Sequence, residues 1–159
     1  MNSNYSDKFN QILQYSKEEA VRLQNDFIGP EHIMLGIIRD GDNKAVDILS
    51  QRFKVDLKSL RANIESQMKN SVVHNSILSA NITLSEKSRS LMHLSILESR
   101  LLHSQTTDAE HLLLAIMKQK NNLPASILNE NDVTYNLLYN ALKKNTLRVK
   151  DEVGYDDIA

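Results

Sequence analysis

Apolar residues in the first part of the chain recur at intervals of three and four. Between residues 6 and 24 the apolar or small positions are Phe9, Ile12, Leu13, Ser16, Ala20 and Leu23. This spacing lines one face of an amphipathic helix. A second helix is predicted to begin at Pro30, because the first residue of a helix needs no intrahelical partner for its N–H. Residues 33–38 are apolar on most sides, so this second helix should be buried.

This pattern occurs twice along the chain, at an offset of 79 residues. The segment Glu31-His-Ile-Met-Leu-Gly-Ile-Ile returns as Glu110-His-Leu-Leu-Leu-Ala-Ile-Met, and the correspondence holds without a gap from residue 5 to residue 49. One residue then drops out, so that Val55 corresponds to Val133. A repeat of this kind indicates that one structural unit is built twice.

Each repeat predicts four helices. Polar residues suited to precede or cap them are Ser6, Asn43, Asp56, Ser85, Asp108, Asn122 and Thr134. Four short helices alone offer a thin core, so the two repeats should pack together as one all-α domain of eight helices with pseudo-twofold symmetry. We expect this domain over residues 1–145, with the first repeat at about 5–69, a linker at 70–83 and the second repeat at about 84–145. Residues 146–159 are predicted to form a flexible acidic linker.

Composition supports this fold class and excludes several functions. Glycine and proline are scarce, at four and two residues, which argues against sheets. Nineteen Lys and Arg balance twenty Asp and Glu, so no broad nucleic-acid footprint is expected. There is no cysteine, the longest apolar runs are six residues, and the start lacks a secretory pattern. We therefore predict a cytoplasmic protein without membrane or nucleic-acid partners.

The sequence offers no motif for catalysis. It contains no phosphate-binding Gly-x-x-x-x-Gly-Lys loop, no Gly-x-Ser-x-Gly elbow and no His-Glu-x-x-His helix. None of the five histidines forms an i, i+4 pair on a predicted helix, so neither a metal nor another cofactor is expected in this chain. A helical hydrolase whose site is assembled only by tertiary folding stays open as an alternative.

The repeated Glu-His pair has two interpretations. In the structural one, Glu31 and Glu110 interact favourably with the helix dipole, while His32 and His111 bury part of each ring and hydrogen-bond the backbone. In the functional one, the two glutamates are partly exposed, symmetric carboxylates that receive cationic groups of a bound protein. A carboxylate can accept a guanidinium through two parallel hydrogen bonds.

Aromatic residues cluster near the two ends of the first predicted helix. They are Tyr5, Phe9, Tyr15 and Phe27. We expect Phe9 and Phe27 in the core. Aromatic side chains that stay exposed beside a groove would provide a docking surface for an unfolded or adaptor protein.

Two longer stretches carry a family resemblance. Tyr5-Ser-Asp-Lys-Phe-Asn-Gln-Ile-Leu-Gln-Tyr-Ser-Lys-Glu-Glu-Ala-Val-Arg-Leu, followed by Ile28-Gly-Pro-Glu-His-Ile-Met-Leu-Gly-Ile-Ile-Arg-Asp-Gly, resembles the Clp N-terminal repeat. Asp108-Ala-Glu-His-Leu-Leu-Leu-Ala-Ile is similar to the same motif. The resemblance covers about residues 4 to 145, and within the family it is strongest to ClpC-type AAA+ unfoldases.

The resemblance implies a non-catalytic domain that docks adaptors and unfolded or marked substrates, at the front of an unfoldase that feeds a ClpP-type protease. ATP would belong to ATPase domains absent from this sequence, toward which residues 146–159 would lead. The isolated domain is predicted to be monomeric. A free-standing adaptor or decoy protein of the same fold is the alternative.

In some members of this family, glutamates of two Gly-Thr-Glu-His motifs help bind phosphorylated arginines on substrates. The matching residues are Glu31 and Glu110, with Ser6 and Ser85 at the threonine positions that open each repeat. The chain departs from the pattern at Gly29-Pro30 and at Asp108-Ala109. Asp108 would place a negative charge near a phosphate, which is unfavourable.

Overall fold

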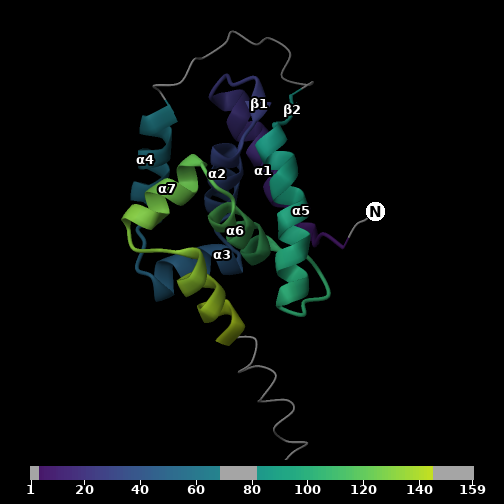
Figure 1. The fold of residues 1–159 in the computed structure, drawn as a ribbon. Coiled ribbons are helices and arrows are strands. Elements are labelled where there is room, and N and C mark those ends of the chain that lie inside the picture. The colour runs from purple at the N-terminus through teal and green to yellow at the C-terminus, as the bar shows by residue number, and fades with distance from the viewer. Residues whose placement is uncertain (1–3, 69–81, 145–159) are drawn as a thin grey trace, which may run out of the picture.

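A computed structural model describes residues 4–68 and 82–144 of the chain (Figure 1). Residues 70–81 of the predicted linker and the predicted acidic tail at 146–159 lie outside the described residues. The division into repeats at these boundaries therefore stays a prediction.

The described residues are almost entirely helical, which confirms the predicted fold class. The first half contains α1 (Asp7–Arg22), the short strand β1 (Phe27–Ile28), α2 (Pro30–Asp40), α3 (Lys44–Asp47), a π-helical turn η1 (Ile48–Arg52) and α4 (Leu57–Met68). The second half contains β2 (Thr83–Leu84), α5 (Glu86–Leu101), α6 (Ala109–Lys118), α7 (Leu123–Glu130) and a last helix at residues 135–144. With η1 counted as the continuation of α3, each described half has four helices.

Local side-chain hydrogen bonds start these helices where the sequence predicts. Ser6 and Ser85 accept from backbone N–H groups three residues further on, at 3.0 and 3.1 Å. Asn43 and Asn122 do the same at 2.8 and 2.9 Å. Such bonds satisfy N–H groups that have no partner inside the helix. Asp56 and Thr134 cap α4 and the last helix, and Pro30 is the first residue of α2.

Helices α2 and α6 form the centre of the molecule. α1 packs along α2, α5 packs along α6, and both central helices also contact α7 and each other. In Figure 1 they lie between α1 and α5 on one side and α4 and α7 on the other. Every residue of α6 from Ala109 to Met117 is at most 9% exposed, which explains why this helix is apolar all round. The prediction that the second helix of each repeat is the buried one is confirmed.

Two short backbone pairings join the halves. β1 and β2 run parallel, with Phe27 opposite Thr83 and Ile28 opposite Leu84. A parallel bridge also links Tyr5 to Thr107. At the 79-residue offset Tyr5 corresponds to position 84 and Ile28 to position 107. The two pairings are therefore equivalent in the two repeats. Each half thus pairs the residues before its first helix with the residues before the partner's second helix, as pseudo-twofold symmetry requires.

The prediction for Phe9 is confirmed and that for Phe27 is wrong. Phe9 is fully buried and stacks on Tyr5 with the ring centroids 4.3 Å apart. Phe27 is 57% exposed, whereas its neighbour Ile28 is 6% exposed. Successive side chains of a strand point to opposite faces, so only one of these two residues can enter the core. The short strand, which the helical pattern did not predict, decides that it is Ile28.

Candidate docking clefts between the two repeats

One cleft of about 500 Å³ lies between the residues that precede α2 and the start of α5. We call it the Glu31 cleft and define it by Phe27, Gly29, Glu31, Ser85 and Lys87, which line it together with their neighbours. Two of the predicted site residues, Glu31 and Ser85, meet here although they belong to different repeats. The parallel pairing of β1 with β2 is what places them together, because Gly29 and Ser85 directly follow the two paired strands.

Glu31 is partly exposed in this cleft, as the functional interpretation requires. Its carboxylate folds back over Gly29, where an added Cβ would collide with Glu31 Oε1. Glycine at position 29 thus gives the Glu31 carboxylate room in its present rotamer, and its backbone angle is an ordinary one. Burial raises the pKa of the Glu31 carboxyl, while a hydrogen bond from its own backbone N–H and the charge of Lys87 act in the opposite direction.

The histidines of the repeated pair serve the structure, as the first interpretation predicts. His32 Nδ1 accepts a 2.8 Å hydrogen bond from the backbone N–H of Gly29, so Nε2 carries the proton and donates to Asn25 Oδ1 at 2.7 Å. His111 Nδ1 accepts from the backbone N–H of Asp108 at 2.9 Å. Burial lowers the pKa of each ring to about 4. Both rings are neutral caps of a helix start.

The second repeat arranges the equivalent residues differently. Asp108 stands where the first repeat has Gly29, and its carboxylate accepts a 2.8 Å hydrogen bond from Ser6 Oγ. Glu110 is only 9% exposed, contrary to the expectation of a partly exposed carboxylate. Its Oε1 has no hydrogen-bond partner among the described residues. Burial first, and then the charge of Asp108, raise the pKa of Glu110, with Lys44 acting in the opposite direction. Ser6 thus contacts Asp108 and not Glu110, and the Glu110 carboxylate is buried.

A second hollow of about 500 Å³ lies along α1 beside β2 and the first turn of α5. Leu13, Ile28 and Leu84 give it an apolar lining, while Lys17 and Arg89 add two cations and no acidic residue joins them. Sequence reasoning missed this groove, because its residues come from both repeats and form no motif. The two hollows lie on opposite sides of β1, because Ile28 lines this groove and Phe27 lines the Glu31 cleft.

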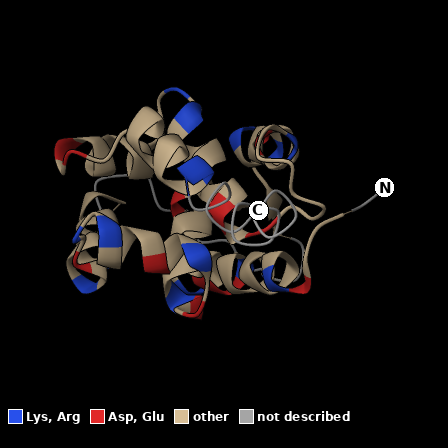
Figure 2. Cartoon of the chain, turned by 90° about the horizontal axis from the view of Figure 1, so that it is seen from below, with Lys and Arg blue, Asp and Glu red and all other residues tan. Residues whose placement is uncertain are grey.

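Neither the distribution of charge nor the metal-binding side chains of the described residues indicate a further site. Basic and acidic residues both occur on several helices in the view of Figure 2. The described residues hold no cluster of three histidine or acidic side chains that could bind a metal ion. In the same part of the chain, no helix combines the length and apolar character needed to cross a membrane. Cytoplasmic location stays a prediction.

The arrangement of helices places the molecule in a known structural class. It is similar to the crystal structure of the N-terminal domain of the chaperone ClpD from Arabidopsis thaliana, with a TM-score of 0.70 and 17% identity over 91% of this chain and 95% of that one. At this identity the likeness defines the fold, which is that of the N-terminal domains of Clp chaperones.

The sequence then identifies the family. It matches the family described as "Clp repeat (R) N-terminal domain" over residues 4–131 and again over 83–158, and the chain belongs to that family. It is 27% identical over 132 residues to the negative regulator of genetic competence ClpC/MecB of Bacillus subtilis, and 29% identical over 132 residues to the chaperone ClpB of Oceanobacillus iheyensis. Each match covers 83% of this chain but only 16% of the relative. The chain therefore corresponds to a small part of those proteins.

Proposed function

We propose that this chain is a non-catalytic docking domain that receives adaptor proteins and unfolded or marked substrates for an ATP-dependent Clp unfoldase. The observation that carries the proposal is the Glu31 cleft. It combines a partly exposed carboxylate with the 57% exposed ring of Phe27, in a cleft lined by residues of both repeats. A partly exposed carboxylate beside an exposed aromatic ring suits a protein ligand that presents a cationic and an apolar side chain.

Family membership supports the wider setting. The relatives named ClpC and ClpB are several times longer than the matched segment, so the ATPase activity and any ClpP-type protease partner belong to the remainder of such a protein. A reading frame that continues past Ala159 into ATPase modules distinguishes this role from that of a free-standing adaptor.

The two repeats contribute unequally to docking in this proposal. Glycine at position 29 leaves room for the Glu31 carboxylate at an open cleft, whereas Asp108 occupies the equivalent place and is tied to Ser6. A phosphorylated arginine would meet the additional negative charge of Asp108 in the second repeat. The Glu31 cleft is therefore the principal site, and Glu110 contributes less.

Binding of fluorescently labelled casein, an unfolded protein, tests the proposal by anisotropy titration. Glu31→Ala is expected to weaken binding about fivefold or more, the loss of one charged hydrogen-bond acceptor. The free energy of unfolding should stay within about 1 kcal/mol of wild type, as is usual for a partly exposed residue. Glu130→Ala, which removes an exposed carboxylate outside the cleft, is the matched control. Unchanged affinity of Glu31→Ala would return Glu31 to a structural role.

A further inference from the structure

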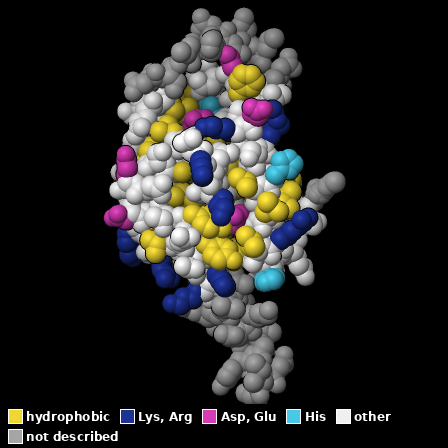
Figure 3. All heavy atoms as spheres, in the orientation of Figure 1, with side chains coloured by type: hydrophobic (Ala, Val, Ile, Leu, Met, Phe, Trp, Pro, Cys, Tyr) yellow, Lys and Arg dark blue, Asp and Glu magenta, His cyan; other side chains and the backbone are white. Residues whose placement is uncertain are grey.

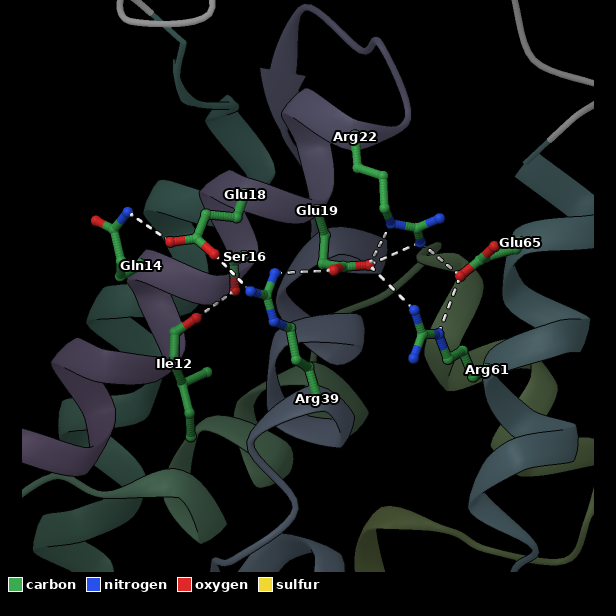
Figure 4. Close-up of polar contacts among 9 residues, drawn as sticks. All are labelled: Ile12, Gln14, Ser16, Glu18, Glu19, Arg22, Arg39, Arg61 and Glu65. Carbon is green, nitrogen blue, oxygen red and sulfur yellow. Dashed lines mark hydrogen bonds and ion pairs between the residues drawn. The ribbon is translucent and has the colours of Figure 1, made fainter.

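The first repeat contains a buried carboxylate surrounded by arginines. Glu19 on α1 is 2% exposed and accepts hydrogen bonds from Arg22 at 2.7 Å and Arg39 at 3.1 Å, and Arg61 lies 3.9 Å away (Figure 4). These arginines come from α1, α2 and α4. A carboxylate that has lost its water needs such partners, because an uncompensated buried charge is costly.

The second repeat keeps the carboxylate and lacks all three guanidinium groups. Its equivalent, Glu98 on α5, is also 2% exposed. The 79-residue offset places Leu101 and Lys118 where the first repeat has Arg22 and Arg39. After the one-residue deletion, Tyr139 corresponds to Arg61. Among the described residues, the hydrogen bond given to Glu98 comes from Tyr135 Oη at 2.7 Å. Burial raises the pKa of Glu98, with Tyr135 and then Lys118 acting in the opposite direction.

Lys118 does not replace the missing arginines. Its ammonium group lies 4.6 Å from the centre of the Tyr135 ring, in a cation–π contact, and no ion pair within 4 Å joins it to Glu98 among the described residues. In the first repeat, by contrast, the equivalent Arg39 reaches the carboxylate directly. Glu98 is thus less well neutralised than Glu19 at the same degree of burial.

The surface around Glu98 is apolar, whereas the equivalent surface of the first repeat is charged. Leu97 and Leu101 are 50% and 55% exposed, and they stand where the first repeat has Glu18 and Arg22. Leu101 follows Glu98 by three residues and therefore lies beside it on the helix surface. Tyr139 stacks on Tyr135 with ring centroids 5.8 Å apart. Apolar side chains gather on this face of the molecule, where α5, α6 and the last helix meet (Figure 3).

We propose that this Glu98 surface, defined by Leu97, Glu98, Leu101, Tyr135 and Tyr139, docks a segment of another protein in which an arginine is flanked by apolar side chains. The guanidinium would take the position at Glu98 that Arg22 takes at Glu19. The inference rests on the proposed docking function but names a second surface and the chemistry of its ligand. Glu98 is twelve residues along α5 from Glu86, about 18 Å from the Glu31 cleft.

Charge complementarity selects this occupant. A purely apolar segment would cover the leucines but leave Glu98 without a counter-charge, whereas an arginine supplies the charge and stacks its planar group on a tyrosine ring. Leu101 is 55% exposed, and exposed side chains change rotamer within nanoseconds, so it can move to admit a ligand beside Glu98. The first repeat shows that this fold accommodates a guanidinium against the equivalent carboxylate.

The test uses the whole chain and two short synthetic peptides, one with an arginine between leucines and one with the neutral isostere citrulline in its place. We expect the arginine peptide to bind about tenfold more tightly, the effect of one charge-assisted hydrogen-bonded pair. Backbone amide signals of Leu97, Leu101 and Tyr139 should shift in a two-dimensional NMR titration. Glu98→Gln should abolish the difference between the peptides.

Leu101→Arg is the sharpest variant, because it restores the residue of the first repeat and should fill the site from within the chain. It is expected to remove binding of the arginine peptide without destabilising the fold. Leu137→Arg is the matched control, since Leu137 is 51% exposed and points away from Tyr135 and Tyr139, two residues on either side in the last helix. It should bind as wild type does.

Several outcomes would overturn the proposal: equal affinity for the two peptides, no binding at millimolar concentration, or full binding by Leu101→Arg. The chain carries Arg148 beyond the described residues. If Arg148→Ala raised peptide affinity tenfold, the occupant would be this chain and not another protein. Loss of peptide binding in Glu31→Ala would assign the peptide to the Glu31 cleft. If Glu31→Ala instead bound casein with unchanged affinity, that result would refute only the proposed role of the Glu31 cleft.

Discussion

Acidification is expected to destabilise the domain through its two buried histidines. His32 and His111 accept backbone hydrogen bonds at Nδ1, so protonation of either ring removes the acceptor that holds the start of α2 or α6. Burial lowers the pKa of both rings from 6.5 to about 4. Between these values the unfolded chain binds protons more readily than the native one, so stability falls as pH falls.

The magnitude follows from the two pKa values. Between pH 7 and pH 5 an unfolded histidine becomes almost fully protonated, whereas a native histidine with a pKa of about 4 stays almost fully neutral. The difference amounts to about 2 kcal/mol for each ring, and about 4 kcal/mol for both. Nearby charges modify this only secondarily: Glu19 raises the pKa of His32, while at His111 Asp108 raises it and Lys44 lowers it.

Urea denaturation at pH 7 and pH 5 measures the effect. The loss of unfolding free energy between the two pH values should be about 2 kcal/mol smaller in His32→Asn and in His111→Asn than in wild type. Glu31, Glu98 and Glu110, whose pKa values are raised, oppose the effect equally in all these proteins. Comparing the pH-dependent loss between variants therefore cancels their contribution.

His93→Asn provides the control, because this histidine is exposed on α5. Its pH-dependent loss should equal that of wild type. If the three variants lost the same stability on acidification, the buried rings would not be the neutral caps described above. A loss in His32→Asn as large as in wild type would refute the hydrogen-bonded assignment of His32 in particular.

Two further substitutions test the packing between helices. Gly36→Ala should lower the unfolding free energy by about 1–2 kcal/mol, although alanine has the better helix propensity. The added Cβ would collide with Ser16 Oγ and lie 2.8 Å from the carbonyl oxygen of Ile12. An increase in stability on urea denaturation would contradict the close approach of α1 to α2. Glu19→Gln should cost about 2 kcal/mol because it removes the charge that accepts hydrogen bonds from Arg22 and Arg39. Glu98→Gln should change stability by less than about 1 kcal/mol, and equal losses would show that the two carboxylates are neutralised alike.

Local sequence determines the helices and their starting points. Ser6, Asn43 and Ser85 cap helices where they were predicted to, because a cap is a hydrogen bond between residues two or three positions apart. The burial of α2 and α6 follows from their apolar residues alone. The 79-residue repeat likewise predicts two similar units, since similar sequences form similar local structure.

The candidate site was only partly predictable. The sequence pointed to Glu31 and Ser85 separately, by way of a family resemblance, but did not show that they share one cleft. It treated Glu31 and Glu110 as equivalent, and the structure makes one partly exposed and the other buried. The second repeat also has a hydrogen bond between Ser6 and Asp108, 102 residues apart, which no local pattern reports.

The amino-acid sequence by itself thus determined the helical class, the helix starts and the doubling of one unit, all of which depend on neighbours along the chain. The tertiary structure decided which copies of a repeated residue stay accessible. It turned Phe27 outward, buried Glu110 and brought Tyr135 into contact with Glu98. Exposure and hydrogen bonding depend on side chains that come together from distant parts of the chain, and periodicity carries no information about those contacts.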